Sequence, residues 1–370
     1  MTPELHKRIA VIPGDGIGPE VIREAVKVVR TLKDLGIGEF EIGTFSYGGK
    51  EYRETGITLP GEAVQEIRRK YDAVLLGTLG DPKAPDQRYV REIFLGLREG
   101  LDLFVGFRPI DILHPKLNPL RDVSGEKINL SVFRDITEGF SANIGGEQRS
   151  HQKKSIAVQE SIYSRTGVQR LMNVVFEFAR RYEKRRITLV DKSNLLRYTH
   201  NLWFEIFKEI GGDYSGITGE HMNVDSFLYE MMRNPGQFQV VVTPDLFGGI
   251  ISEFCAALQG GVGVAATSYL HPGKIGLFRP VHGPAPNAVD RNIANPFGAI
   301  DCIRQMLTFF GRPKTARLIR DSLHYCVEHR LVTPDLGGSL GTGEVGDYVC
   351  QAAERLYSQA RGQNAQEGDQ

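Results

Sequence analysis

The segment from Arg8 to Leu35 most constrains the fold, because it predicts a β-strand, a glycine-rich turn and a helix in direct succession. A short β-branched run ends at Pro13, the turn Gly14-Asp-Gly-Ile-Gly-Pro-Glu20 follows, and apolar residues then recur at helical spacing for about four turns. Pro19 suits a first helical position, where its missing N–H has no intrahelical partner. As a phosphate loop the turn is a weak signal, because its Gly-x-Gly-x-Gly spacing differs from Gly-x-Gly-x-x-Gly.

The same alternation continues along the chain. Apolar runs of strand length alternate with segments of helical spacing, which predicts an α/β fold with a largely parallel sheet. The predicted strands are residues 40–45, 73–76, 128–133, 155–160, 186–190 and 238–243, and the predicted helices are residues 166–182 and 202–210, one that begins at 225, one after 244 and a long one after 292–298. The prolines and glycine of residues 279–287 predict a loop. A length of 370 residues favours two lobes.

Charge and cysteine usage exclude several classes of function. Forty-five basic residues balance forty-five acidic residues, so no net charge draws the chain to nucleic acid or to a membrane. No run near the start resembles a signal peptide, and no apolar run approaches membrane-spanning length. The four cysteines, Cys255, Cys302, Cys326 and Cys350, show no Cys-x-x-Cys spacing. Free thiols in a reducing compartment are therefore expected, with the cytoplasm as the location.

Three arginines are candidate ligands for a polycarboxylate. Arg98 and Arg108 flank a short apolar segment that predicts a strand-like hinge, and Arg134 follows the run 128–133. A guanidinium group binds a carboxylate bidentately and stays charged near neutrality, so the three could converge on one small polycarboxylate. The alternative is that all three form ordinary surface ion pairs.

A set of motifs resembles one family over residues 8 to about 350. In chain order they are Ile-Pro-Gly-Asp-Gly-Ile-Gly-Pro-Glu, Arg98 with Arg108-Pro, Val-Phe-Arg134, Asp191-Lys192-Ser-Asn194, Val224-Asp225, Asp-Leu-Phe-Gly, His282-Gly-x-Ala-Pro and Ile-Ala-Asn-Pro. Together they resemble the β-decarboxylating dehydrogenases, which include isopropylmalate, isocitrate, homoisocitrate and tartrate or D-malate dehydrogenases. The ordered set favours the ligand-binding interpretation of the three arginines.

The resemblance implies an isopropylmalate/isocitrate dehydrogenase-like two-domain α/β fold, not a standard Rossmann fold. Residues 1–109 and 260–370 would form a large nucleotide-binding α/β domain, and residues 110–259 a small central domain. An arm at about residues 139–160 would clasp a second subunit. In the family the active site lies between the domains and receives its lysine and one aspartate from the partner chain, so a homodimer with shared active sites is expected.

The resemblance also implies a chemistry. Family members oxidise a (2R)-hydroxy acid by hydride transfer to NAD or NADP, and most then lose the β-carboxylate with the help of Mg²⁺ or Mn²⁺. Carried over to this chain, Arg98, Arg108 and Arg134 would hold substrate carboxylates. Lys192 would act with Asp225 to take the hydroxyl proton, which requires a lowered lysine pKa.

The nucleotide would lie at a separate set of residues. The resemblance implies Thr78 and Asn194 beside the nicotinamide, Arg279 in place of a nearby glutamate, and His282, Gly283, Ala285, Asn287 and Asn295 at the adenosine end. NAD users place an acidic residue at position 287 and NADP users a lysine. Asn287 matches neither, but the missing positive charge favours NAD, with NADP as the alternative.

Some positions depart from the family pattern. The family's metal-binding Asp-x-x-x-Asp is Gly249 and Glu253 here, so the predicted metal ligands are Asp225, Glu253 and, as a substitute, Asp245, for which a helix cap is the alternative role. Ser141 stands at the position of the family's catalytic tyrosine, and the hydroxyl of a serine is a far poorer acid than the phenol of a tyrosine.

The arginines at two further positions bear on the substrate. Arg91 replaces the glutamate of isopropylmalate enzymes, which argues against isopropylmalate. Arg91 or Arg279 would bind an extra acidic group.

The expected function is therefore NAD(P)-dependent oxidation, with β-decarboxylation, of a malate-like (2R)-hydroxy di- or tricarboxylate. One alternative is a catalytically impaired homologue that binds a ligand or regulates another subunit. The other is a non-redox decarboxylase or lyase that uses the same pocket. Retention of both Lys192 and Asp225 favours the dehydrogenase.

Overall fold

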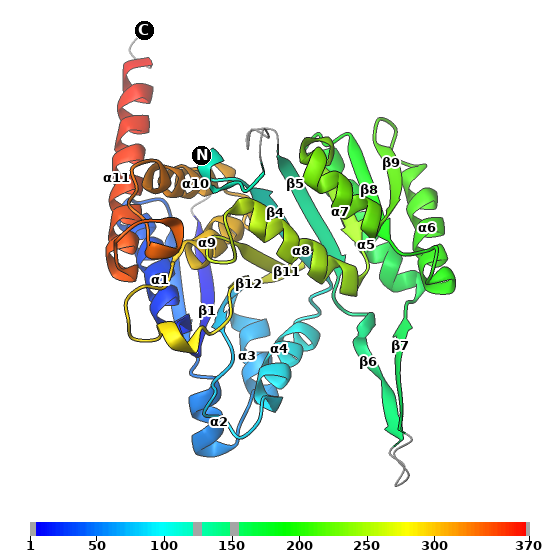
Figure 1. The fold of residues 1–370 in the computed structure, drawn as a ribbon. Coiled ribbons are helices and arrows are strands. Elements are labelled where there is room, and N and C mark those ends of the chain that lie inside the picture. Colours follow the sequence, from blue (N-terminus) through cyan, green and yellow to red (C-terminus); the bar gives the residue numbers. More distant parts are fainter. Residues whose placement is uncertain (1–4, 121–127, 149–154, 368–370) are drawn as a thin grey trace. The chain divides into compact units, whose positions relative to one another are not determined.

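The computed structural model describes residues 5–120, 128–148 and 155–367. The chain divides into two compact units (Figure 1). Unit 1 contains both chain ends, as Met1–Asp102, Ile112–Pro119 and Ala256–Gln370, and unit 2 consists of Leu103–Asp111 and Leu120–Cys255. The sequence predicts the boundaries between the two domains after residues 109 and 259, whereas the main boundaries between the units of the structure follow Asp102 and Cys255.

Unit 1 has a mostly parallel sheet. Its strands are β1 (His6–Gly14), β2 (Glu39–Thr44), β3 (Ala73–Thr78), β11 (Ala266–His271) and β12 (Ile275–Pro280). They follow the order β2-β1-β3-β12-β11, in which β11 alone pairs in the antiparallel sense. Every residue of β3 is buried, because helices cover both faces of a parallel sheet.

Helices of unit 1 pack on this sheet through apolar stripes. They are α1 (Gly18–Asp34), α2 (Gly49–Thr55), α3 (Gly61–Lys70), α4 (Arg88–Gly100), α9 (Phe297–Phe309), α10 (Pro313–Glu328) and α11 (Thr342–Glu367). In α1 the buried residues Val21, Ile22, Ala25, Val28 and Val29 recur every three or four positions, which places them on one face. That face contacts α9 and α11, so the start and the end of the chain share one core.

The glycine-rich turn after β1 is held by its own aspartate. The buried carboxylate of Asp15 accepts hydrogen bonds from the backbone N–H of Gly49 (2.6 Å), the backbone N–H of Gly80 (2.8 Å) and the hydroxyl of Tyr89 (2.6 Å). Gly14 has φ +72°, and a Cβ there would lie 2.0 Å from the Thr78 carbonyl oxygen. The turn therefore needs its first glycine for close backbone packing, and its aspartate joins three segments of unit 1.

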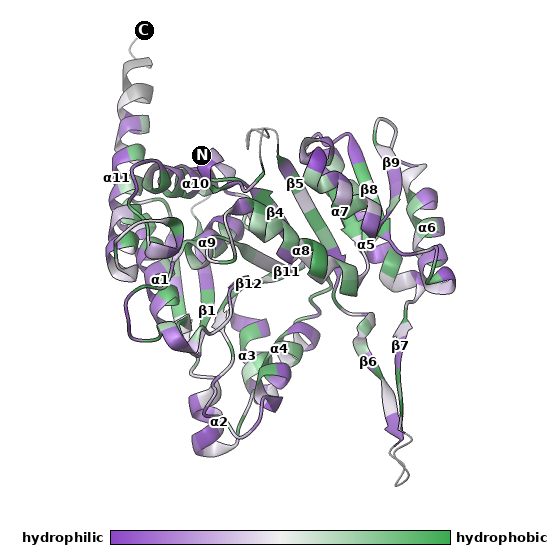
Figure 2. Ribbon diagram, viewed as in Figure 1, coloured by the Kyte–Doolittle hydropathy of each residue, from purple (hydrophilic) through white to green (hydrophobic). Residues whose placement is uncertain are grey.

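Unit 2 contributes further strands that pair mostly in the parallel sense. Its strands are β4 (Val105–Asp111), β5 (Asn129–Asp135), β8 (Arg186–Asp191), β9 (Thr218–Asn223) and β10 (Val240–Thr243), in the order β4-β5-β10-β8-β9. Only β4 pairs in the antiparallel sense. The helices are α5 (Arg165–Arg181), α6 (Arg197–Gly211), α7 (Val224–Arg233) and the larger part of α8 (Asp245–Gln259), which extends past the end of unit 2 at Cys255. Helix α8 is strongly hydrophobic (Figure 2). Large aromatic side chains, among them Trp203, Phe176 and Phe227, are fully buried.

A two-stranded antiparallel ribbon also belongs to unit 2. It consists of β6 (Gly139–Gln148) and β7 (Ile156–Ile162), with Ile144 opposite Glu160 and Gln148 opposite Ile156 (Figure 1). The predicted arm at residues 139–160 falls on this ribbon, and its residues 149–154 lie outside the described part of the chain. Ile156 and Val158 are 61% and 50% exposed, and as alternate strand residues they point to one side.

Most predicted elements are confirmed. The strands predicted at 8–13, 40–45, 73–76, 128–133, 155–160, 186–190 and 238–243 correspond to β1, β2, β3, β5, β7, β8 and β10. Two predictions were wrong. Arg98 lies in helix α4, not on a strand-like hinge, and Arg279 with Pro280 ends strand β12, so the predicted loop begins only after them.

The structure also bears on the cysteines and on membrane insertion. All four cysteines are free and buried. In the described part of the chain, none of the helices combines the length and the apolar character needed to cross a membrane.

Replacing Asp15 should destabilise unit 1. Asp15→Ala leaves two backbone N–H groups and one hydroxyl without their acceptor, and we expect the free energy of unfolding to fall by about 3 kcal/mol. Urea unfolding followed by circular dichroism would measure this. The control is Asp34→Ala at an exposed position, where a change within about 0.5 kcal/mol is expected. Equal stability of both variants would contradict the role given to Asp15.

Candidate active site

Unit 2 brings Lys192 and Asp225 together. Strand β8 ends at Asp191 and helix α7 begins directly after β9, and the parallel register pairs Asp191 with Asn223. The two side chains therefore meet at the carboxyl ends of neighbouring strands, with Lys192 Nζ 2.6 Å from Asp225 Oδ1. The hydrogen bond from Lys192 lowers the pKa of Asp225, whose side chain is 65% exposed. One chain thus holds an ammonium and a carboxylate as a preformed pair.

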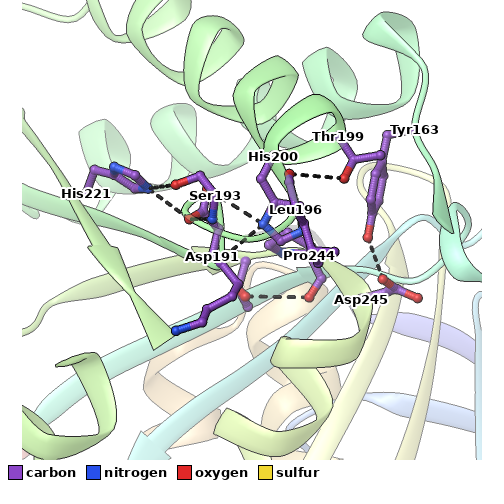
Figure 3. A network of polar contacts seen from close by, with 11 residues as sticks. Tyr163, Asp191, Ser193, Leu196, Thr199, His200, His221, Pro244 and Asp245 are labelled. Carbon is purple, nitrogen blue, oxygen red and sulfur yellow. Dashed lines mark hydrogen bonds and ion pairs between the residues drawn. The ribbon is translucent and has the colours of Figure 1, made fainter. Parts of the chain in front are cut away.

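The turn that carries Lys192 rests on a buried polar network (Figure 3). The backbone N–H of Lys192 donates to Nδ1 of His200 over 2.9 Å. Oδ1 of Asp191 accepts the backbone N–H of Ser193 and contacts Nε2 of His221, both at 2.9 Å. Asp191 and His200 are almost completely buried, and burial lowers the pKa of His200. A neutral His200 with an unprotonated Nδ1 matches the bond that it accepts.

The sequence did not point to His200 or His221. Neither belongs to the motif around Lys192, since His200 is eight residues from Lys192 and His221 is thirty from Asp191. Only the pairing of β8 with β9 and the first turn of α6 bring them to the site.

Arg108 and Arg134 lie on the antiparallel pair β4 and β5. Arg108 is buried, and its Nη1 donates to the Ser252 carbonyl oxygen at 2.5 Å while its Nη2 lies 3.4 Å from Oε1 of Glu253. Arg134 packs on the first turns of α8. A Cβ at Gly248 would lie 2.4 Å from the Cβ of Arg134, and a Cβ at Gly249 would lie 3.3 Å from its Nη1. The two guanidinium groups are therefore fixed by strands and by α8.

The predicted metal ligands have other partners in the described chain. The buried Asp245 accepts a hydrogen bond from the hydroxyl of Tyr163 (2.5 Å; Figure 3). It also accepts one from the backbone N–H of Ser141 (2.8 Å). Burial raises the pKa of Tyr163, so its hydroxyl remains a donor. Glu253 faces Arg108, and Asp225 faces Lys192.

These contacts do not suit a divalent metal ion. Within residues 5–120, 128–148 and 155–367 of one chain, no group of three or more His, Cys, Asp or Glu side chains could hold a metal ion. The contacts within a single chain therefore do not favour metal binding by Asp225, Glu253 and Asp245, and their role as metal ligands stays a prediction.

Unit 1 holds two of the residues predicted for the nicotinamide end, Thr78 and Arg279, and two predicted substrate arginines. Thr78 ends β3, is buried and donates its hydroxyl to the Asp15 carbonyl oxygen over 2.5 Å. Arg98 is buried and Arg91 exposed, two turns apart on α4. Arg279 is half-buried on β12. Asn194 belongs to unit 2, where it is exposed in the turn after Lys192.

The loop after β12 contains the residues predicted for the adenosine end. His282 is buried, which lowers its pKa, and its Nδ1 contacts the Gly283 carbonyl oxygen at 3.1 Å. Ala285 has φ +41°, a left-handed conformation, and Asn287 is exposed. The amide of Asn295 is used inside the chain, since Nδ2 donates to Asp335 over 2.9 Å and Oδ1 accepts the backbone N–H of Phe297.

The burial of His200 predicts a pH dependence of stability. Its pKa is lowered in the folded state, so below about pH 6.5 the unfolded chain binds more protons than the folded chain, and stability falls as the pH falls. His200→Asn removes this group and keeps a short acceptor, so its free energy of unfolding should fall less steeply between about pH 7 and pH 5. Urea unfolding across that range measures the slopes. The control is the exposed His324→Asn, and equal slopes for wild type and His200→Asn would refute the prediction.

Comparison with known proteins gives one consistent result. The family model described as isocitrate/isopropylmalate dehydrogenase matches residues 8–349. A 3-isopropylmalate dehydrogenase of Thermobifida fusca is 35% identical, with 93% of this chain and 97% of the relative covered. A homoisocitrate dehydrogenase of Methanocaldococcus jannaschii is 32% identical, with 92% of this chain and 96% of the relative covered. A probable tartrate dehydrogenase/decarboxylase of Agrobacterium vitis is 31% identical, with 93% of this chain and 97% of the relative covered.

Solved structures agree. The isocitrate dehydrogenase from Methylococcus capsulatus superposes with a TM-score of 0.82 at 31% identity, covering 94% of this chain and 99% of that one. The family consists of β-decarboxylating hydroxy-acid dehydrogenases, for which NAD(P), a divalent metal and decarboxylation are typical. The predicted fold class and the resemblance are confirmed: the chain belongs to the isocitrate/isopropylmalate dehydrogenase family.

Proposed function

We propose that this chain oxidises a malate-like (2R)-hydroxy di- or tricarboxylate with NAD(P)⁺ and releases its β-carboxylate. The observation that carries the proposal is the Lys192–Asp225 pair, 2.6 Å apart at the carboxyl ends of β8 and β9. Open α/β sheets place their ligands at that edge. The membership of the family supplies the reaction class.

Proton transfer is the step that the pair would perform. An amine takes the hydroxyl proton of the substrate only when it is unprotonated, so Lys192 must first release a proton to solvent. The exposure of Asp225 gives that proton a path to water. The hydrogen bond from the Lys192 backbone to His200 holds the turn while the charge on the side chain changes.

Substrate recognition is assigned to three arginines. Arg98, Arg108 and Arg134 would bind the carboxylates, since bidentate guanidinium contacts fix both charge and orientation. NAD is the preferred nucleotide in this proposal, because the exposed Asn287 offers no positive charge to a 2′-phosphate. No step is assigned to a metal ion, because the described residues of one chain do not form its site.

An impaired, ligand-binding homologue is the second candidate. Glu253, at a family metal position, faces Arg108, and Gly249 offers no side-chain ligand. Ser141 cannot replace a tyrosine as a proton donor, and its backbone N–H is bound to Asp245. These features favour binding without efficient turnover.

Lysine removal tests the proposal. We expect the purified protein to reduce NAD⁺ or NADP⁺ with at least one of malate, tartrate, isocitrate or homoisocitrate. Lys192→Met removes the proton acceptor and should lower kcat by about 100- to 10,000-fold. Absorbance of the reduced nucleotide measures this, with the exposed Lys314→Met as the control that keeps full activity.

Three other outcomes would contradict parts of the proposal. Unchanged kcat in Lys192→Met would remove the lysine from the mechanism. Turnover that appears only after Gly249→Asp with Ser141→Tyr would favour the impaired homologue. Release of CO₂ without nucleotide would identify a decarboxylase.

A homodimer with shared active sites is part of the proposal, and the ribbon β6–β7 is its proposed contact. Ile156 and Val158 point to the same side of the ribbon and are exposed, and exposed apolar side chains that lie together are typical of an interface. A charged residue at either position would disfavour burial against a second subunit. Ile156→Asp with Val158→Asp should shift the protein from dimer to monomer in light scattering after size-exclusion chromatography. The control is Ile57→Asp, an exposed isoleucine of unit 1, which should leave the dimer intact. A dimer that survives the double substitution would exclude the ribbon as its main contact.

A further inference from the structure

Unit 2 contains a cavity at the amino ends of β8 and β9. Its volume is about 750 Å³, and its lining residues include Arg180, Lys184, Arg185, Asp213, Tyr214 and Ile217. They come from the end of α5 and the segments that precede the two strands. Lys192 and Asp225 follow the carboxyl ends of the same parallel strands, and a six-residue strand spans about 20 Å. A ligand in this cavity would therefore not occupy the place of a substrate at the catalytic pair.

Lys184 is a half-buried cation in the lining of the cavity. Its Nζ donates hydrogen bonds to Oδ1 of Asn129 (2.8 Å) and to the carbonyl oxygen of Asn129 (3.4 Å). In residues 5–120, 128–148 and 155–367, no carboxylate oxygen lies within 4.0 Å of this Nζ. An ammonium group has three N–H donors, so these two acceptors leave one donor unused within the described chain. Burial of a cation that no anion compensates is unfavourable, and it lowers the pKa of Lys184.

Other groups around the cavity do not neutralise this charge. The carboxylates of Glu183 and Asp213 are exposed, and neither raises the pKa of Lys184. The carbonyl groups at the end of a helix attract cations, but the Ala179 carbonyl oxygen of α5 accepts the backbone N–H of Lys184 instead, over 2.8 Å. Arg185 adds a second positive charge, whose exposed guanidinium group forms no ion pair with any residue that the structure describes. Both cations are available to an anionic ligand.

An aromatic ring belongs to the same cavity. Tyr214 is partly buried, and its ring centroid lies 5.2 Å from that of Phe176, which in turn contacts Phe207 at 5.5 Å. This packing holds the ring of Tyr214 in place, and Ile210 and Ile217 add apolar surface to the lining. Small-molecule sites combine aromatic and apolar walls with a few polar groups, in volumes of roughly 300 to 1,000 Å³. The cavity therefore suits an organic anion better than an inorganic one.

We propose that this cavity binds a small organic oxyanion, with its phosphate or carboxylate group on Lys184 and Arg185 and a planar or apolar body against Tyr214. The site lies in unit 2 alone and shares no residue with the arginines assigned to the substrate. The alternative is that Lys184 only connects the segment before β8 to the start of β5 through Asn129. That role requires no ligand, so binding measurements distinguish the two.

Calorimetric titration at fixed ionic strength tests the site. The probes are phenyl phosphate and benzoate, which carry a ring, and inorganic phosphate, which does not. We expect wild type to bind phenyl phosphate or benzoate at least about tenfold more tightly than inorganic phosphate, and equally well with excess malate and NAD⁺ present. Lys184→Met should weaken this binding by about tenfold or more, Arg185→Gln should weaken it less, and Lys184→Arg should retain most of it. The control is Lys208→Met, an exposed position of α6 outside the cavity, which should match wild type.

The outcomes decide both the site and its ligand. Tighter binding of phenyl phosphate supports a phosphate monoester, and tighter binding of benzoate supports a carboxylate. Binding that malate or NAD⁺ displaces, and that Lys184→Met leaves unchanged, belongs to the active site and overturns the proposal. Ring-bearing probes that bind no better than inorganic phosphate, or a wild type that binds none of the probes, also overturn it without any variant. Arg185→Gln, at an exposed position, keeps the test decisive if Lys184→Met does not fold. None of these results depends on turnover, so the proposed function stands or fails separately.

Discussion

The turn that carries Lys192 depends on one buried carboxylate. Asp191 has no exposure to water, and its Oδ1 holds the backbone of Ser193 and the ring of His221 at the same time. A buried carboxylate is unfavourable without donors, so the two groups that bond to Oδ1 are held in nearly fixed positions. The ion pair between Lys192 and Asp225 is therefore set by polar contacts beneath it, and the exposed pair itself contributes little to stability.

Several motif residues serve the fold more than the ligand. The aspartate of the glycine turn, Asp15, joins three segments, Asp245 binds the ribbon, and Asn295 holds the start of α9. All three are buried, and each has its side-chain oxygens engaged by protein donors. A polar residue that recurs in a family motif can thus be required for folding even where the neighbouring residues do the chemistry.

The sequence predicted the parallel strands and the residues of the catalytic turn well, because periodicity and short motifs are local signals. It missed strands β6, β9, β11 and β12, which are short or contain polar residues and gain their stability from pairing. The helical position of Arg98 and the contacts of His200 were also missed, since tertiary packing decides them. Motif spacing also could not show whether Asp225, Glu253 and Asp245 come together to bind a metal ion. Each of the three carboxylates contacts a residue from another part of the chain, and only the tertiary structure shows those contacts.

The hydrogen bonds at Asp245 connect the ribbon rigidly to the first turn of α8. Ser141 belongs to β6 and Tyr163 follows β7, so both strands are attached to the same carboxylate at the beginning of the helix. That helix packs through Gly248 against Arg134 and carries the carbonyl oxygen that holds Arg108. A force applied to the ribbon would be transmitted to the two arginines of unit 2 through a rigid helix instead of being absorbed by a loop.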